Sequence, residues 1–310
     1  MKYLVTGGGG FIGSNIVKRL LENGNMVRVL DNFATGLRSN IEPFAKDVEL
    51  IEGDIRDFWT VVKATKGIDY ILHQAALPSV PRSIDNPLTS SEVNINGTLN
   101  ILEAARFNGI KRVVFASSSS VYGDSPVMPK EETMKTMPKS PYAITKLAGE
   151  EYCMNFYQLY GLETVALRYF NVFGPRQNPF SQYAAVIPKF ISMLKNDQKP
   201  TIFGDGETSR DFTFIENVVN ANLLAAEQKS AAGNVFNIAC NRAFTLNALV
   251  EKLNNIMGTK IPPEHLPEKK GDIKHSLADI NKARKILNYS ADIDFDEGLR
   301  RTVEWHFAKK

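Results

Sequence analysis

Tyr142 and Lys146 stand four residues apart in the segment YAITK, and on a helix this spacing places both side chains on one face. A tyrosine phenol has an ordinary pKa of about 10, so it is a poor base near neutral pH unless a neighbouring ammonium stabilises its charged form. Lowering that pKa to about 7 takes roughly 4 kcal/mol. A Tyr-x-x-x-Lys match is expected about once by chance in such a chain. The pair therefore predicts a general base only together with other residues.

A run of four serines, Ser117 to Ser120, ends a predicted strand at 112–118. Ligands of doubly wound sheets bind at the carboxyl edge, where such strands end. Hydroxyls of Ser118 and Ser119 at this edge can hydrogen-bond a substrate alcohol whose proton the tyrosine removes, while a nicotinamide takes the hydride. The alternative is an ordinary serine-rich loop. Together with the Tyr/Lys pair, the serines favour a hydride-transfer site.

The segment TGGGGFIG follows the first predicted strand and opens the first predicted helix, with glycines at Gly7, Gly10 and Gly13. The first glycine permits a tight turn, the second lets backbone N–H groups approach a pyrophosphate, and the third permits close packing of helix on strand. A glycine triplet alone also fits an ordinary turn. Its place between a strand and a helix predicts a dinucleotide site.

Asp31 ends the second predicted strand about 18 residues after Gly13, where a carboxylate accepts hydrogen bonds from ribose hydroxyls. A carboxylate there repels a 2′-phosphate, and the nearest basic residue, Arg28, lies inside the strand, so the sequence favours NAD over NADP. Asp54 closes the third strand, where it either contacts the adenine or only forms the turn. These two interpretations are left open.

Short apolar runs alternate with helical patterns through the first half of the chain. Strands are predicted at 3–6, 26–31, 48–54, 70–76 and 112–118, and helices at 11–22, 94–107 and 142–160. The strands are almost continuously apolar, which is typical of strands buried on both faces. We therefore predict an α/β fold of the Rossmann type, with a doubly wound parallel sheet.

After Phe170 the chain has longer loops rich in Gly and Pro, although 164–170 and 234–239 still resemble buried strands. We predict a dinucleotide-binding domain at 1–170, to which later strands return near 212–239. The remaining residues, 171–310, are predicted to form a smaller, irregular substrate-binding region.

Composition excludes several classes of protein. With 310 residues, 43% hydrophobic and 23% charged, the chain is typical of a globular protein. A net charge of +3 argues for neither nucleic acid nor a membrane surface as a partner. Cys153 and Cys240, like the four histidines, show no ligand spacing, so we expect no disulfide framework and no metal. The first strand begins near Met1, and no apolar run is long enough to span a bilayer, which favours a cytoplasmic protein.

Several motifs together resemble the extended short-chain dehydrogenase/reductase family, and within it the nucleotide-sugar 4-epimerases. They are TGGGGFIG, the serine run followed by VYGD, SPYAITK and RYFNVFGPRQ. The likeness is greatest to UDP-N-acetylglucosamine 4-epimerases, through HQAALPSVPRSIDNP, QYAAVIPKF, GDGETSRDF and GDIKHSLADI. This resemblance extends over essentially the whole chain.

The resemblance implies a role for residues that the spacing alone does not single out. Its catalytic positions are Ser118, Ser119, Tyr142 and Lys146. Its cofactor positions are Gly7, Gly10, Gly13, Asp31, Asn32, Asp54, Ile55, Ala75, Tyr142 and Lys146. Its substrate positions are Ser118, Tyr142, Asn171, Ala185, Val186, Arg210, Lys269, Asp272 and Ser276. Lys269 departs from the family, which usually has an arginine there, so one diphosphate contact loses its bidentate geometry.

The resemblance also implies the reaction. Tyr142 would remove the proton of the sugar 4-hydroxyl, NAD would take the hydride, and a 4-keto sugar would turn over before the hydride returns. A nucleotide-sugar 4,6-dehydratase is an alternative, although Ser119 and Ser120 stand where such enzymes have an acidic pair. A non-catalytic NAD-binding regulator is a second alternative. Relatives imply a homodimer.

Ser276 bears on the identity of the sugar. In the resembling epimerases the sixth residue of GDIKHS lines the pocket beside carbon 2, and a large tyrosine there restricts relatives to glucose and galactose forms. The small Ser276 therefore predicts that UDP-N-acetylglucosamine and its epimer are accepted, beside UDP-glucose and UDP-galactose. The alternative is that Ser276 only caps the turn before the LADINKARKIL helix.

Overall fold

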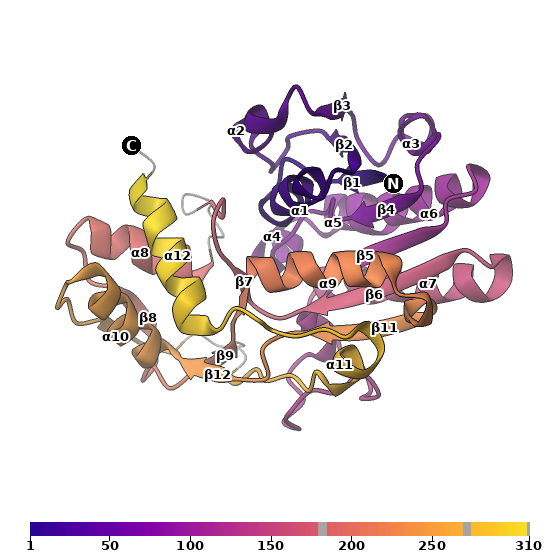
Figure 1. The fold of residues 1–310 in the computed structure, drawn as a ribbon. Helices are drawn as coiled ribbons and strands as arrows, with labels where there is room; N and C mark the ends of the chain where they lie inside the picture. Colours follow the sequence, from indigo (N-terminus) through magenta and orange to yellow (C-terminus); the bar gives the residue numbers. More distant parts are fainter. Residues whose placement is uncertain (179–184, 269–273, 309–310) are drawn as a thin grey trace.

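Seven parallel strands form the central sheet of the protein, seen in a computed structural model that describes residues 1–178, 185–268 and 274–308 (Figure 1). The strands lie in the order β11-β6-β5-β4-β1-β2-β3. Their bounds are β1 Lys2–Thr6, β2 Met26–Asp31, β3 Val48–Glu52, β4 Tyr70–His73, β5 Arg112–Ser118, β6 Glu163–Tyr169 and β11 Asn234–Ile238. The strand order reverses between β1 and β4, which opens a crevice at the carboxyl edge.

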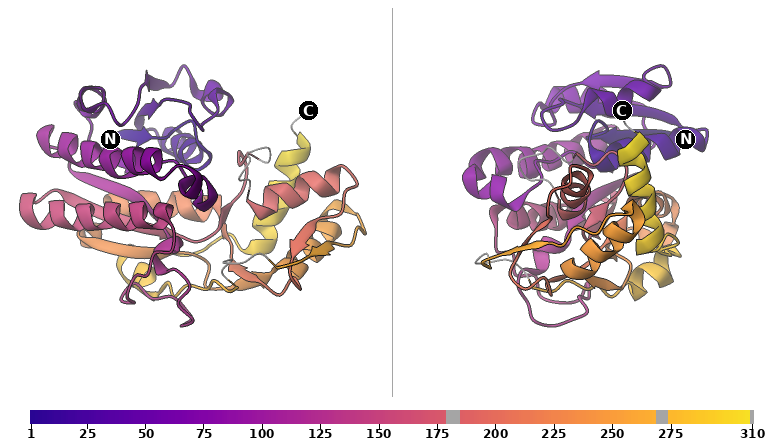
Figure 2. Two further views of the ribbon diagram at one scale, coloured as in Figure 1. Left: turned by 180° about the vertical axis from the view of Figure 1, so that it is seen from behind. Right: turned by 90° about the vertical axis from the view of Figure 1, so that its left-hand side faces the viewer.

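Helices cover both faces of this sheet. On one face lie α1 (Phe11–Glu22) and α9 (Ile215–Glu227), which pack against each other in front of the strands in Figure 1. The opposite face, seen from behind in Figure 2, is covered by α3 (Phe58–Thr65), α6 (Gly97–Phe107) and α7 (Pro141–Tyr160). The predicted α/β doubly wound fold is confirmed.

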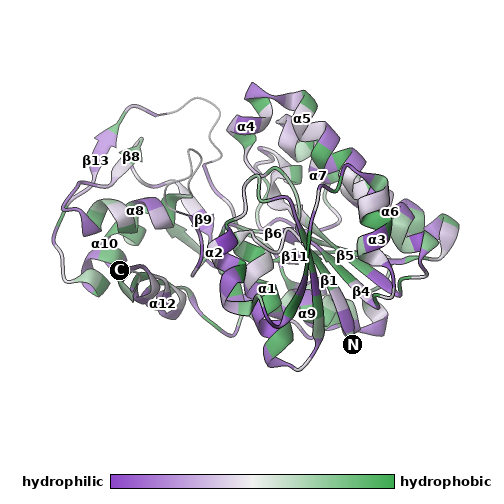
Figure 3. Ribbon diagram, turned by 90° about the horizontal axis from the view of Figure 1, so that it is seen from above, coloured by the Kyte–Doolittle hydropathy of each residue, from purple (hydrophilic) through white to green (hydrophobic). Residues whose placement is uncertain are grey.

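Neighbouring strand residues enter two different apolar cores, as the pleat of a strand requires. Leu4 packs with the core under α3, α6 and α7, whereas Val5 packs with the core under α1 and α9. Figure 3 shows the apolar strands at the centre of the molecule. The burial of these strands on both faces is the reason for their continuous apolar runs.

The edge strand β3 corrects one prediction. Glu49, Leu50 and Glu52 are exposed, with 41% of the Leu50 surface open to solvent. The glutamates of β3 stay solvated and charge this edge of the sheet, whereas the other edge strand, β11, is buried from Phe236 to Ile238. The prediction that all these strands are buried on both faces was wrong for β3.

Beside the sheet, the later part of the chain forms short paired strands with helices packed against them. The strand pairs are β7 (Val172–Phe173) with β10 (Thr213–Phe214), β8 (Thr201–Phe203) with β13 (Glu264–Leu266), and β9 (Ser209–Asp211) with β12 (Ala243–Thr245). The helices α8 (Val186–Lys195), α10 (Leu246–Met257) and α12 (Phe295–Ala308) gather beside them (Figure 1). A stack of aromatic rings holds this region together, with the ring centroids of Phe244 and Phe295 4.2 Å apart. A division of the chain at about residue 170 stays a prediction.

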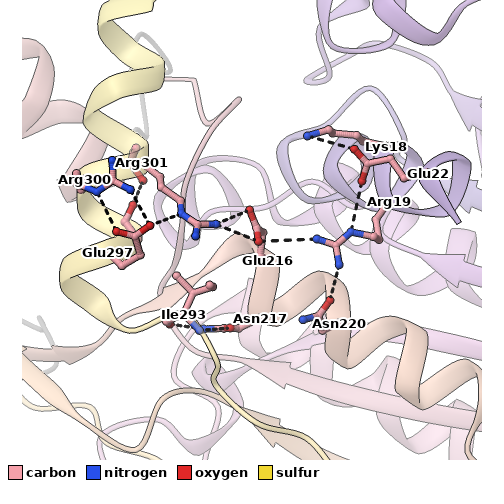
Figure 4. Close-up of polar contacts among 12 residues, drawn as sticks. Lys18, Arg19, Glu22, Glu216, Asn217, Asn220, Ile293, Glu297, Arg300 and Arg301 are labelled. Atoms are coloured by element: carbon pink, nitrogen blue, oxygen red, sulfur yellow. Dashed lines mark hydrogen bonds and ion pairs between the residues drawn. The ribbon is translucent and has the colours of Figure 1, made fainter.

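A chain of charged side chains connects the two regions across α9 (Figure 4). Glu216 of α9 lies 3.8 Å from the guanidinium of Arg19 on α1 and 3.2 Å from that of Arg301 on α12. Arg301 also contacts Glu297 at 2.6 Å. These groups are partly exposed, so each pair contributes little to stability. Among the described residues, no helix has the length and apolar character needed to cross a bilayer.

Candidate active site

The start of α7 places Tyr142 and Lys146 at the carboxyl edge of the sheet. The Ser140 hydroxyl accepts a hydrogen bond from the backbone N–H of Ala143, and Pro141 is the first helical residue. Lys146 is buried, and its Nζ donates to the carbonyl oxygen of Ala116 at 2.8 Å. The same Nζ lies 5.8 Å from the centroid of the Tyr142 ring. The structure therefore brings the predicted pair together.

Strand β5 ends beside this pair. The Ser118 hydroxyl accepts a hydrogen bond from the N–H of Ser120 at 3.2 Å, and the Ser118 side chain lies close enough to Tyr142 to lower the pKa of its phenol. Ser119 begins the 3-10 turn that follows the strand. The Ser120 hydroxyl is buried and has no hydrogen-bond partner within the described chain. Sequence analysis assigned no binding role to Ser120, and an orphaned buried hydroxyl at this edge is the signal of a ligand contact.

The pKa of Tyr142 differs from the sequence-based expectation. Burial raises it to about 12, although the hydrogen bond from Ser118 lowers it. The ammonium of Lys146 does not overcome this cost, since it is directed to the carbonyl oxygen of Ala116. In the chain alone the phenol is therefore protonated at neutral pH, and a further positive charge is needed to make it a base.

The loop from Gly7 to Gly13 forms a concave surface, the glycine cradle, which side chains in place of its glycines would fill. Gly7 has a φ of +69°, and a Cβ there would lie 2.7 Å from the backbone nitrogen of Ala75. A Cβ on Gly13 would lie 2.2 Å from the carbonyl oxygen of Gly7. Gly10 begins α1 without a side-chain cap, and no acidic residue lies in the first turn. The uncapped N–H groups of α1 therefore fit a pyrophosphate, as the sequence predicts.

The carboxylate of Asp31 is tied to this loop. It accepts hydrogen bonds from the N–H of Gly9 at 2.8 Å and from the N–H of Phe33 at 2.7 Å. Only 8% of the residue is exposed, and burial raises its pKa. Arg28 points elsewhere, since its guanidinium donates to the carbonyl oxygen of Ala64. Sequence analysis missed Arg38, whose guanidinium lies 4.3 Å from the centroid of the Phe33 ring.

The adenine-side candidates lie at the ends of β2 and β3. Asn32 donates to Asp54 at 2.9 Å, and Arg56 holds the same carboxylate at 2.7 Å. This arginine keeps the pKa of Asp54 below its ordinary value. Ile55 is buried beside it. Asp54 forms part of the turn after β3, and its side chain is also partly exposed at the edge of the sheet. Both the adenine contact and the purely structural turn therefore stay open.

The substrate candidates form two groups. Arg210 on β9 donates to the carbonyl oxygen of Lys274, and Ser276 donates its N–H to the carbonyl oxygen of Ser209, so both residues lie on adjoining segments. Asn171 approaches the same strand through a hydrogen bond to the carbonyl oxygen of Asp211. Ala185 caps the start of α8, and Val186 is its first residue. Lys269 and Asp272 lie outside the described residues.

The structure places Ser276 ahead of the next helix, not at its N-cap. The helix that follows is α11 (Asn281–Leu287), and its capping residue is Ile280. Ser276 stands further upstream, in an extended segment beside β9. Ser276 is therefore not the N-cap of α11, and its role in the turn before that helix stays a prediction.

His73 is a hydrogen-bonded core residue, as the sequence suggests. Its ring nitrogens contact the hydroxyls of Thr6 at 2.7 Å and Thr98 at 3.0 Å. Burial and the nearby Lys146 ammonium lower its pKa to about 3. The ring is therefore neutral at any ordinary pH.

Residues 3–239 match the sequence pattern of the NAD dependent epimerase/dehydratase family. The chain belongs to this family. A UDP-N-acetylglucosamine 4-epimerase from Methanobrevibacter ruminantium M1, solved in complex with UDP-N-acetylmuramic acid, is 44% identical with a TM-score of 0.95, covering 100% of this chain and 99% of that one. A UDP-glucose 4-epimerase from Mycolicibacterium smegmatis is 37% identical over 98% of both chains.

Another member of the NAD dependent epimerase/dehydratase family has a different activity. A dTDP-glucose 4,6-dehydratase from Streptomyces venezuelae, solved with NAD, is 30% identical with a TM-score of 0.92 and covers 100% of this chain and 98% of its own. Family membership confirms the predicted resemblance, the prediction of an enzyme and NAD as its cofactor. The roles of individual residues stay predictions.

Proposed function

We propose that the protein is an NAD-dependent UDP-sugar 4-epimerase. The observation that carries the proposal is the arrangement of Tyr142, Lys146 and Ser118 at one sheet edge, where Lys146 docks on β5 and the Ser118 side chain lowers the pKa of Tyr142. The glycine cradle opens at the same edge. The 4-epimerases among the similar proteins support the proposal.

The residues present fit the cofactor. The cradle of Gly7, Gly10 and Gly13 would hold the pyrophosphate, and the Asp31 carboxylate would hold the adenosine ribose. Bound NAD supplies a positively charged nicotinamide ring that accepts a hydride and later returns it. A cation beside a phenol lowers the pKa of that phenol, which is the change that Tyr142 requires.

Tyr142 moves the proton in this proposal. As carbon 4 of the sugar becomes a ketone, the Tyr142 oxygen takes the proton of the 4-hydroxyl, and it gives the proton back when the hydroxyl is formed again. The Ser118 hydroxyl holds the sugar oxygen close to that phenol. A flat 4-keto sugar that turns over in the site is reduced on its opposite face, which yields the 4-epimer.

The later region would hold the UDP group. Arg210 is the charged candidate for the diphosphate, with Asn171, Ala185 and Val186 around the nucleotide and Ser276 near carbon 2 of the sugar. Lys269 and Asp272 are proposed for the same group from the resemblance alone. Because Ser276 is small, we infer that an N-acetyl group is accepted at carbon 2.

Incubation of the purified protein with UDP-N-acetylglucosamine and with UDP-glucose tests the proposal. Chromatography and proton NMR of the products distinguish the three outcomes. The 4-epimer is expected, a 4-keto-6-deoxy sugar would identify a dehydratase, and unchanged substrate with bound NAD would identify a regulator. Ser119 and Ser120 carry no carboxylate for eliminating water, which disfavours the second outcome.

We also propose a homodimer. Ile84 on α4 (Val80–Asp85), Leu88 on α5 (Pro87–Ser91) and Ile144 on α7 are apolar and 61%, 77% and 53% exposed. The three helices contact one another, and exposed apolar side chains on neighbouring elements are typical of an interface. Sedimentation velocity should give the mass of two chains, and Leu88→Lys should give one. A monomeric native protein would contradict this proposal.

A further inference from the structure

A buried ion pair lies behind Lys146, and the reaction as described does not use it. Glu150 is 2% exposed and Arg168 4% exposed. The Arg168 guanidinium contacts both carboxylate oxygens of Glu150, at 2.9 Å through Nε and 2.7 Å through Nη2. The hydroxyl of Ser117 donates to the same carboxylate. Burying two charges costs several kcal/mol even when they are paired, so the pair needs an explanation beyond stability.

The position of the Glu150–Arg168 ion pair in the fold suggests such an explanation. Tyr142, Lys146 and Glu150 follow one another at intervals of four on α7, so they share a helix face. Consecutive residues of β5 interact with these three turns: the carbonyl oxygen of Ala116 accepts from Lys146, the Ser117 hydroxyl donates to Glu150, and the Ser118 side chain lowers the pKa of Tyr142. Glu150 is therefore part of the same contact between strand and helix as the proposed catalytic groups.

The groups around Lys146 show why the charge of Glu150 matters for the protonation of this lysine. Burial lowers the pKa of Lys146 to about 8, and the Glu150 carboxylate opposes that effect. The other titratable groups facing Lys146 are neutral near pH 8: His73 because burial lowers its pKa to about 3, Cys153 and Tyr142 because burial raises theirs. The positive Arg168 lies beyond Glu150. Without the carboxylate, the buried ammonium would lose the negative charge that opposes the effect of its burial.

We propose that Glu150 is a positioning residue that keeps Lys146 protonated and docked on β5 beside Tyr142. This inference rests on the proposed function, because a charged Lys146 affects catalysis only if Tyr142 works as a base. It needs no contact between Glu150 and substrate or cofactor. Ser117 and Arg168 fix the carboxylate in place.

The central test is Glu150→Gln, which keeps the shape and removes the charge. Activity should fall at high pH when Lys146 loses its proton, so the descending limb of the kcat profile reports that event. In Glu150→Gln this limb should move down by about one pH unit or more, since Arg168 then repels the ammonium without compensation. Glu151→Gln, an exposed neighbour on the same helix, is the matched control and should leave the limb unchanged.

A second readout does not depend on turnover. Lysines labelled with ¹³C at Cε report their own titration by NMR, and Lys146→Met identifies the resonance of Lys146. The midpoint should lie near pH 8 in the native protein, lower in Glu150→Gln and higher in Arg168→Gln. If Glu150→Gln does not fold, the double variant Glu150→Gln/Arg168→Gln removes both charges, and its midpoint should still lie below that of Arg168→Gln.

Equal Lys146 midpoints in Glu150→Gln and Glu151→Gln would overturn the proposal, as would equal midpoints in the double variant and Arg168→Gln. A native protein that is inert toward UDP-sugars would overturn the proposed function instead. The NMR titration separates these failures, because it measures the Glu150–Lys146 coupling in either case.

Discussion

Glu150 and Asp211 are both buried carboxylates, but their partners differ between the two regions of the molecule. Glu150, beside the Tyr/Lys pair, contacts the Arg168 guanidinium at 2.7 Å. Asp211, on the strand that carries Arg210, is 0% exposed and accepts backbone N–H groups, from Cys240 at 2.9 Å and Ala278 at 3.2 Å. Burial raises the pKa of Asp211 to about 7.

The difference suggests how the two regions work. Near α7 the Arg168 guanidinium compensates the buried Glu150 carboxylate. Around Asp211, within the described part of the chain, backbone N–H dipoles compensate the charge, and the carboxylate joins β9 to the segments at Cys240 and Ala278. We therefore expect substitutions near α7 to change the chemistry, and substitutions near β9 to change ligand binding.

Tyr142→Phe should have the largest effect. It removes only the ionisable oxygen, so turnover should fall by 100-fold or more while the fold and NAD binding persist. Steady-state rates with UDP-sugars and the content of bound NAD measure the two properties. Tyr152→Phe, on the same helix, is the control. More than about a tenth of native activity in Tyr142→Phe would exclude Tyr142 as the base.

Ser276→Tyr should abolish one activity and spare the other. A bulky ring near carbon 2 should exclude the N-acetylated sugar and leave room for UDP-glucose, which changes specificity rather than stability. Ser276→Ala keeps the space and should accept both sugars. The ratio of kcat/KM for the two substrates is the measurement. Equal losses with both sugars, together with a lower Tm, would indicate a purely structural role for Ser276.

Arg210→Ala should weaken binding more than chemistry. Removing one partner of a charge pair costs about 2 to 5 kcal/mol, and the partly exposed Arg210 should be near the lower value, roughly 30-fold in affinity. Calorimetric titration with UDP measures this change. Arg284→Ala, an exposed arginine on α11, should leave the affinity unaltered. If UDP binds both variants equally, Arg210 does not hold the diphosphate.

The sequence predicts the first region better than the second, for physical reasons. Strand β5 has the bounds predicted for it, because its apolar run and the serines that end it are local signals. The two-residue strands β7 and β10 are too short to show any periodicity. The exposure of β3 depends on strand order, which no local pattern encodes. The partners of Glu150 and Asp211 come from distant segments, so neither contact could be predicted.

Asp211 determines the last expected effect, which concerns stability rather than activity. The rise of its pKa from an ordinary 3.8 to about 7 means that the folded state binds the proton more tightly than the unfolded chain. This contribution to stability is complete below about pH 4 and is lost as the pH rises to about 7. The rise corresponds to a free energy on the order of 4 kcal/mol.

Asp211→Asn should therefore have a different pH dependence of unfolding from the native protein. Asparagine does not ionise, so the variant avoids the cost of a buried charge, although it presents fewer acceptor lone pairs to the N–H groups. The difference in the free energy of unfolding in urea, variant minus native, should increase between pH 4 and 7, so that the variant gains stability relative to the native protein. Above pH 8 this difference should stay constant. Asp205→Asn changes an exposed carboxylate of the same region and should follow the native protein throughout. A difference between Asp211→Asn and the native protein that is the same at every pH would mean that Asp211 stays charged across this range. The two buried carboxylates would then behave alike, and the contrast between the regions would not hold.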